Sequence, residues 1–402
     1  MSGGGWSKER LGRMHDVMAG HVERGWVPGL VTLVSRRGDV HVDAIGTTAV
    51  GGRDPMRRDT IFRITSMTKP VTAVAAMILV EECVLRLDDP VDGLLPELAG
   101  RRVLRRIDGP LDDTVPANRP ITLRDLLVYT MGFGIIFDVA GGDPYPIHRA
   151  VEDLGVRTLG PPTPPVTHTP DEWLRRLGTL PLMAQPGEAW MYNTGSCVLG
   201  VLIARASGQP LETFLRERIF EPLGMRDTAF SVPPEKLGRL ATCYAANPET
   251  GVLEVFDGVE GGQWSRLPVF PDASAGLVST VDDYLAFGQM MLNKGRLGSE
   301  RILSRPSVDL MTTDQLTPEQ KARSNGSWDG RGWGFGMSVI TRRDGVSSTP
   351  GRYGWDGGYG TSWYSDPGED MVAVLMTQRM DFPLFSPVWL DFWTSAYQAI
   401  DD

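Results

Sequence analysis

The sequence contains little cysteine and lacks the motifs that mark several common enzyme classes. Only three of its 402 residues are cysteines, Cys83, Cys197 and Cys243, and none of them forms a C-x-x-C pair. A disulfide framework or a structural zinc site is therefore not expected. The five histidines form no H-E-x-x-H spacing, and neither G-x-S-x-G nor G-x-x-x-x-G-K-[ST] occurs. These absences argue against a zinc hydrolase, a nucleophile elbow and a phosphate-binding loop, and we expect no metal and no cofactor.

Positive charge is also scarce, and long apolar runs are missing. The chain has 40 lysines and arginines against 50 acidic residues, a formal net charge of -10. A nucleic-acid partner normally needs a basic face, so none is expected. No segment approaches the roughly 18 apolar residues that a membrane span requires. Residues 1–20 contain several charged side chains and do not resemble a signal peptide. We therefore expect a cytoplasmic protein that acts on a small molecule; its oligomeric state stays open.

Strand-like segments occur near both ends of the chain, with helices and loops between them. Residues 88–269 are predicted to form short helices joined by long loops, whereas β-rich runs precede and follow them. This order favours a discontinuous α/β domain, residues 1–87 and 270–402, with an inserted and mostly helical domain, residues 88–269. The expected strands are 30–35, 40–45, 333–340, 359–365 and 371–377, and the expected terminal helices are 8–25 and 387–400. Residues 61–64 are a further short apolar stretch that leads directly to Ser66.

The most apolar helix in the sequence is predicted at residues 67–85. Its side chains are hydrophobic on nearly every side, which is typical of a buried helix. Pro70 is compatible with such a helix only in the first turn, where its missing N–H costs nothing. Ser66 is therefore predicted to lie at the N-terminal end of a central helix.

Ser66 and Lys69 form an S-x-x-K tetrad, the only one in the chain. Residues three apart on a helix share a face, so the lysine amine can reach the serine hydroxyl. Burial lowers the pKa of a lysine, and an amine of lowered pKa can take the proton of a serine nucleophile. The alternative is a helix-capping serine followed by a solvated lysine. A lysine in so apolar a helix favours the first interpretation.

Several further segments resemble one family of enzymes, in the order in which the family has them. The chain is similar to class C serine β-lactamases, penicillin-binding proteins and their esterase relatives, the family VIII carboxylesterases. The resemblance implies an α+β fold of the β-lactamase/transpeptidase type, with an antiparallel sheet flanked by helices. The matching segments are Leu85 to Val91, Ile121 to Leu127, Thr130 to Gly132, Pro186 to Tyr192, Pro222 to Met225 and Asp227-Thr228.

The resemblance assigns roles to two further motifs. In the Y-x-N motif of the family, Tyr192 takes the place of the tyrosine that exchanges protons with the nucleophile and the leaving group. Thr194 replaces the asparagine that β-lactamases use around the substrate. The alternative for Tyr192 is a tyrosine that only packs in the core.

The third family motif, K-T-G in β-lactamases, has the form Trp355-Asp356-Gly357 here, which resembles the esterase branch. These three residues and Gly358 are the expected oxyanion and substrate-binding group, with the N–H groups of Gly358 and Ser66 as the oxyanion hole. Trp355 has no charge with which to hold the carboxylate of a β-lactam. The alternative is a glycine-rich hairpin with a packing tryptophan.

Together these patterns predict a serine hydrolase that cleaves carboxylic esters through an acyl-enzyme on Ser66, with Lys69 and Tyr192 as general base and acid. A β-lactamase, an amidase or peptidase, a transesterase and a non-catalytic binding protein remain alternatives. The loops 109–120, 141–170 and 255–268 are expected to select the acyl and alcohol groups.

Overall fold

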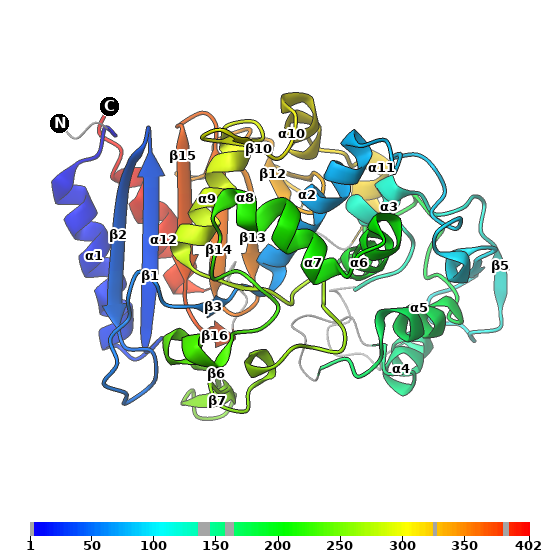
Figure 1. The fold of residues 1–402 in the computed structure, drawn as a ribbon, viewed down its shortest axis with the longest axis horizontal. Helices are drawn as coiled ribbons and strands as arrows, with labels where there is room; N and C mark the ends of the chain where they lie inside the picture. Colours follow the sequence, from blue (N-terminus) through cyan, green and yellow to red (C-terminus); the bar gives the residue numbers. More distant parts are fainter. Residues whose placement is uncertain (1–3, 136–144, 157–164, 325–327, 381–385) are drawn as a thin grey trace.

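The computed structural model describes residues 4–135, 145–156, 165–324, 328–380 and 386–402. One end of the molecule is a layered region in which an antiparallel sheet has helices on both faces, and the other end consists of helices and loops from the middle of the chain (Figure 1). These layers match the predicted α+β arrangement. Part of the predicted loop 141–170 lies outside the described residues.

The large sheet combines strands from both ends of the chain. It has seven strands in the order β11-β12-β13-β14-β15-β1-β2, and every neighbouring pair is antiparallel. The C-terminal β15 pairs with the N-terminal β1, with Val31 opposite Met376. The division into two domains at residues 87 and 270 stays a prediction. The strands are β1 (Gly29–Arg36), β2 (Asp39–Gly46), β11 (Arg331–Trp333), β12 (Ser338–Ile340), β13 (Tyr353–Gly357), β14 (Thr361–Asp366) and β15 (Met371–Met376).

One face of the sheet, here called the back face, is covered by the two terminal helices. α1 (Lys8–Glu23) and α12 (Pro387–Gln398) pack against each other, and the ends of the chain meet at a bridge between Trp6 and Ile400 (Figure 1). Ser7 caps the start of α1, and its side chain accepts a hydrogen bond from the N–H of Arg10. Apolar side chains of both helices and of the sheet form a separate small core there.

The opposite face, the front face, is covered by α9 (Val281–Leu292), which contacts β14 and β15. α2 (Thr68–Glu81) packs against α6 (Thr194–Ser207), and the main core continues from the sheet into the helical region (Figure 1). Only Val80 and Glu81 of α2 are not buried, as its apolar composition predicts.

Shorter elements complete the described structure. The remaining strands are β3 (Phe62–Arg63), β4 (Arg102–Leu104), β5 (Thr114–Pro116), β6 (Cys243–Ala246), β7 (Leu253–Asp257), β8 (Val278–Ser279), β9 (Arg296–Leu297), β10 (Glu300–Arg301) and β16 (Arg379–Met380). The remaining α-helices are α3 (Leu123–Leu127), α4 (Pro146–Asp153), α5 (Pro170–Gly178), α7 (Leu211–Leu215), α8 (Glu221–Leu223), α10 (Arg305–Met311) and α11 (Pro318–Ala322). Helical turns of other types are η1 (Thr65–Met67), η2 (Pro96–Leu98), η3 (Arg216–Phe220), η4 (Pro234–Arg239) and η5 (Gln263–Ser265).

The prediction of one strand at 333–340 is wrong. The segment forms a tight turn between β11 and β12, because two glycines allow it to fold back. Gly336 has φ +71°, which a side chain disfavours, and a Cβ on Gly334 would lie 2.0 Å from the carbonyl oxygen of Met311.

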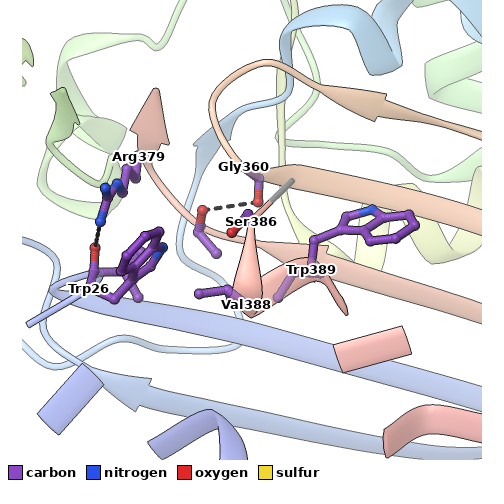
Figure 2. Close-up of a pocket in the computed structure, with 9 residues that line it drawn as sticks. Trp26, Gly360, Arg379, Ser386, Val388 and Trp389 are labelled. Atoms are coloured by element: carbon purple, nitrogen blue, oxygen red, sulfur yellow. Dashed lines mark hydrogen bonds between the residues drawn. The ribbon is translucent and has the colours of Figure 1, made fainter. Parts of the chain in front are cut away.

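A cavity of about 10 Å³ lies between the end of the sheet and α12 (Figure 2). Val388 and Trp389 of α12 line it together with Gly360, and the guanidinium of Arg379 packs 3.8 Å from the ring centre of Trp26 at its edge. So small a cavity holds about one water molecule, so it is no site for an organic substrate.

No helix within the described ranges is long and apolar enough to cross a membrane.

Candidate active site

The chain makes a strained turn directly before Ser66. β3 pairs with β8, and the following turn η1 carries Ser66 to the start of α2. Thr65 has φ +41°, a conformation that non-glycine residues rarely adopt. The turn is held by the Tyr284 hydroxyl, which donates to the Met67 carbonyl oxygen at 2.6 Å. Ser66 is half-buried while its neighbours are buried, so this turn presents the hydroxyl at the end of a buried helix.

The amine of Lys69 lies within hydrogen-bond distance of Ser66. Its Nζ donates to Ser66 Oγ at 2.9 Å and to the carbonyl oxygen of Ser274 at 2.8 Å. The side chain is fully buried. Burial lowers the pKa of Lys69 to about 7, while the negative charge of Asp272 acts in the opposite direction. At neutral pH a large fraction of the amine is therefore unprotonated and able to accept a proton.

Tyr192 lies on the other side of the same hydroxyl. Its ring centre is 4.5 Å from Lys69 Nζ, and its phenol shares a hydrogen bond with Ser66. Asn193, the next residue, has φ +81° and ends the extended segment where α6 begins. Burial raises the pKa of the Tyr192 phenol, and the hydrogen bonds of the phenol with Ser66 and Trp355 oppose that rise. The phenol therefore keeps its proton at neutral pH.

Aromatic rings surround the phenol. Trp355 of β13 donates from Nε1 to the Tyr192 hydroxyl at 2.7 Å, and its ring packs edge-on against Trp333, with ring centres 4.6 Å apart. Trp190 and Tyr129 pack against Tyr192 as well. Trp333 and Tyr129 have no role in the family motifs quoted above, and only the fold shows that they belong here. Apart from the half-buried Trp355, these rings are buried, so they form a packed apolar cluster around the phenol.

The end of β13 lies against the turn that carries Ser66. A Cβ on Gly357 would lie 2.3 Å from the carbonyl oxygen of Ile64 and 2.7 Å from Thr65 Oγ1, so only glycine allows this approach. Gly358 follows directly after the strand and is half-buried. The structure thus places the end of β13, with Trp355, Gly357 and the following Gly358, next to the turn that carries Ser66.

Asp356 is not part of this group, although we predicted it from the motif. Its carboxylate accepts hydrogen bonds from Ser362, Tyr364 and Trp389 at 2.5, 2.9 and 2.8 Å. Trp389 belongs to α12, on the back face of the sheet. Successive side chains of a strand point to opposite faces, so Asp356 points away from the face that Trp355 occupies.

The structure adds two residues that the sequence did not reveal. Ser274 supplies the carbonyl oxygen for Lys69, and Asp272 accepts hydrogen bonds from both the N–H and the hydroxyl of Ser274. They precede β8, and the Leu277 N–H donates to Thr68 Oγ1 at 3.1 Å, which fastens this segment to α2. No sequence motif marks these residues.

Within the described residues, no cluster of three or more histidine, cysteine or acidic side chains is arranged to hold a metal ion.

This fold, together with a serine, a lysine and a tyrosine around one hydroxyl, defines a serine hydrolase of the β-lactamase and penicillin-binding-protein type. A family model described as Beta-lactamase matches residues 14–393, and the chain belongs to that family. The predicted family and fold class are thereby confirmed.

The chain is also similar to individual proteins and solved structures. The chain is 41% identical to Protein Rv1367c of Mycobacterium tuberculosis, over 89% of this chain and 87% of that protein. It is 30% identical to esterase EstB of Burkholderia gladioli, over 92% of this chain and 90% of that protein. Among solved structures it resembles EstCE1, described as a hydrolase with promiscuous acyltransferase activity, with a TM-score of 0.77, 26% identity and coverage of 98% of both chains.

Proposed function

We propose that this protein hydrolyses carboxylic esters of small, uncharged molecules through an acyl-enzyme on Ser66. Ser66 Oγ attacks the ester carbonyl carbon, the bond to the alcohol oxygen breaks, and the alcohol leaves. Water then attacks the acyl-enzyme, which releases the acid and restores the serine. The single observation that carries this proposal is the 2.9 Å hydrogen bond between Lys69 Nζ and Ser66 Oγ.

The two proton-transfer roles follow from the pKa values of the side chains. Lys69, with a pKa of about 7, takes the proton of Ser66 during acylation. Tyr192 keeps its proton because burial raises its pKa, so it donates to the departing alcohol oxygen and is reprotonated by Lys69. A phenolate base would need a much lower pKa than burial allows here.

Two backbone N–H groups complete the proposed mechanism. The N–H of Ser66, at the start of a helix, and the N–H of Gly358, after β13, hold the developing oxyanion. Support comes from the close approach of Gly357 to the Ile64–Thr65 backbone, which brings the end of β13 next to the Ser66 turn.

An ester fits the site better than a β-lactam. The uncharged Trp355 offers its N–H to Tyr192 and has no charge for a drug carboxylate. Thr194 opens α6 in the place where the family has an amide side chain. Relatives named as esterases, including EstB, point the same way.

The test is Ser66→Ala, with short-chain nitrophenyl esters as substrates and a fluorophosphonate as a covalent probe. We expect hydrolysis to fall to background and the probe to label the wild-type protein once, at Ser66. Ser231→Ala, another half-buried serine that lies outside this site, is the matched control and keeps full activity. Full hydrolysis by Ser66→Ala would refute the proposal.

Acyl transfer to an alcohol is the second candidate function. It uses the same acyl-enzyme, with an alcohol in place of water, and EstCE1 is a hydrolase with such a promiscuous activity. The half-buried ring of Trp355 beside the Tyr192 phenol offers an apolar surface to an organic acceptor. Adding short-chain alcohols and measuring the ratio of new ester to free acid tests it; an unchanged yield of acid would contradict it.

A further inference from the structure

A buried acidic residue lies next to the proposed general base without forming a salt bridge. Asp272 is 8% exposed, and among the described residues no lysine or arginine lies within salt-bridge distance of its carboxylate. A buried charge without an ion partner is costly, so such residues usually have a function that compensates for the cost. The hydrogen bonds of Asp272 indicate what that function is.

Asp272 fixes the conformation of the segment that holds Lys69. Its Oδ1 accepts from the N–H of Ser274 at 2.7 Å and from the Ser274 hydroxyl at 2.6 Å, while its own carbonyl oxygen accepts from the N–H of Gly276 at 2.7 Å. Gly276 is required there, because a Cβ would lie 2.7 Å from that carbonyl oxygen. This closed turn directs the carbonyl oxygen of Ser274 at Lys69 Nζ.

Few other ionisable groups act on the amine within the described residues. α6 contributes Cys197, whose Sγ lies 3.7 Å from Asp272 Oδ1 and whose pKa is raised by burial, so the thiol is neutral. The segment before α6 contributes the Tyr192 phenol, which is also neutral. The turn η1 contributes the Ser66 hydroxyl, and α7 contributes no group that shifts the Lys69 pKa. Asp272 is therefore the negative charge that Lys69 experiences.

We propose that Asp272 is a positioning residue for Lys69: its carboxylate fixes the Ser274 carbonyl oxygen that receives the amine, and it places one buried negative charge beside that amine. The inference rests on the proposed function, in which Lys69 must lose its proton before Ser66 can attack. The charge of Asp272 stabilises the protonated amine and thereby sets the lowest pH at which the enzyme works. Without the charge of Asp272, burial would lower the pKa of Lys69 further, and the enzyme would work at a lower pH.

The experiment follows the rate at which a fluorophosphonate labels Ser66 as a function of pH, measured by intact mass. Asp272→Asn keeps an acceptor oxygen for Ser274 but removes the charge. We expect the midpoint of the rise in labelling rate, near pH 7 in the wild type, to move down by about one pH unit. A role in folding alone would lower the labelled fraction without moving the midpoint.

The matched control is Asp283→Asn on α9. Asp283 is also 8% exposed and also accepts hydrogen bonds from a backbone N–H and a hydroxyl, those of Asp227 and Thr228, but it does not act on Lys69. The pH midpoint of the labelling rate of Asp283→Asn should equal that of the wild type. Asp272→Ser, a smaller change without charge, gives a second reading if Asp272→Asn does not fold.

Two failures are distinguishable. A wild-type protein that the probe does not label at Ser66 would overturn the proposed function and this inference with it. A labelled wild type whose midpoint is unchanged in the charge-free Asp272 variants would overturn the inference alone and leave the serine mechanism intact.

Discussion

The two faces of β13 differ although they are built from adjacent residues. Trp355 points to the front face, where its single hydrogen bond goes to the Tyr192 hydroxyl. Asp356 points to the back face, where its carboxylate accepts three hydrogen bonds from the sheet and α12. In the proposed mechanism, the same strand thus supports chemistry on one side and stability on the other.

The difference extends to the surroundings of each residue. On the front face, Thr65 has a strained backbone and Lys69 is a buried amine whose pKa is lowered to about 7. On the back face, the guanidinium of Arg352 packs against aromatic rings, with the ring centre of Trp393 3.9 Å away. Strain and a buried amine cost stability and are retained where they serve reactivity. Substitutions on the front face should therefore change rates, and those on the back face should change stability.

The largest expected effect is that of Lys69→Met. Ester hydrolysis should fall by about 10³-fold because Ser66 loses its base. The fold should become more stable by roughly 1–2 kcal/mol, because a buried amine is replaced by an apolar chain of similar length. Urea unfolding and steady-state rates measure the two effects; loss of both activity and stability would contradict the comparison.

The stability that Lys69→Met gains over the wild type should depend on pH in a definite direction. The unfolded chain protonates Lys69 near 10.5 and the folded chain near 7, so between these values the unfolded state binds more protons. Wild-type stability therefore rises across this window. The advantage of Lys69→Met should therefore be greatest below about pH 7 and shrink as the pH rises towards 10.5. Lys294→Met, at a half-exposed lysine that pairs with Asp309, should show no such dependence in this window.

Tyr192→Phe tests the other side of the hydroxyl. We expect kcat to fall by about 10²-fold with little change in KM, since the proton donor for the leaving alcohol is lost. Because burial raises the pKa of the phenol, wild-type activity should not decline between pH 8 and about 10. A decline centred in that range would mean that the phenol titrates there, and would reverse the roles proposed for Tyr192 and Lys69.

A smaller effect is expected for Trp355→Phe, which removes one N–H donor and keeps an aromatic ring. The loss of about 0.5–1.5 kcal/mol corresponds to a roughly 2- to 12-fold lower kcat. Trp389→Phe is the matched change on the back face, because it removes the N–H that donates to Asp356. It should lower stability by a similar amount and leave kcat unchanged. Equal effects of both variants on kcat would remove the distinction between the faces.

The sequence revealed the parts of the site that are local in the chain. The spacing of Ser66 and Lys69 places both on one helix face, and the apolar helix around Lys69 predicts the burial that lowers its pKa. Tyr192 and Trp355 came only from the resemblance to a family, because no spacing rule relates residues so far apart. The structure brings them together through α6 and β13, which converge on the start of α2.

There are physical reasons why the sequence misassigned Asp356 and did not reveal Asp272. Asp356 was grouped with Trp355 because the two are adjacent in a motif, whereas the period of two in a strand separates adjacent side chains. Asp272 was missed because its role depends on a turn whose geometry is set by tertiary contacts with α2. α9 was missed as well, although Thr280 and the acidic Asp282 and Asp283 form a typical helix start.

The smallest effect on rate, and a large one on stability, is expected for Asp356→Ala. Three buried donors, on Ser362, Tyr364 and Trp389, would lose their acceptor, which should cost roughly 2–5 kcal/mol in the free energy of unfolding. The kcat of the folded fraction, counted by fluorophosphonate labelling of Ser66, should stay within about threefold of the wild type. Asp356→Asn should be milder, since its amide keeps one acceptor oxygen. A fall in kcat as large as that of Tyr192→Phe, without loss of stability, would return Asp356 to the substrate-binding group and show that β13 does not separate chemistry from stability.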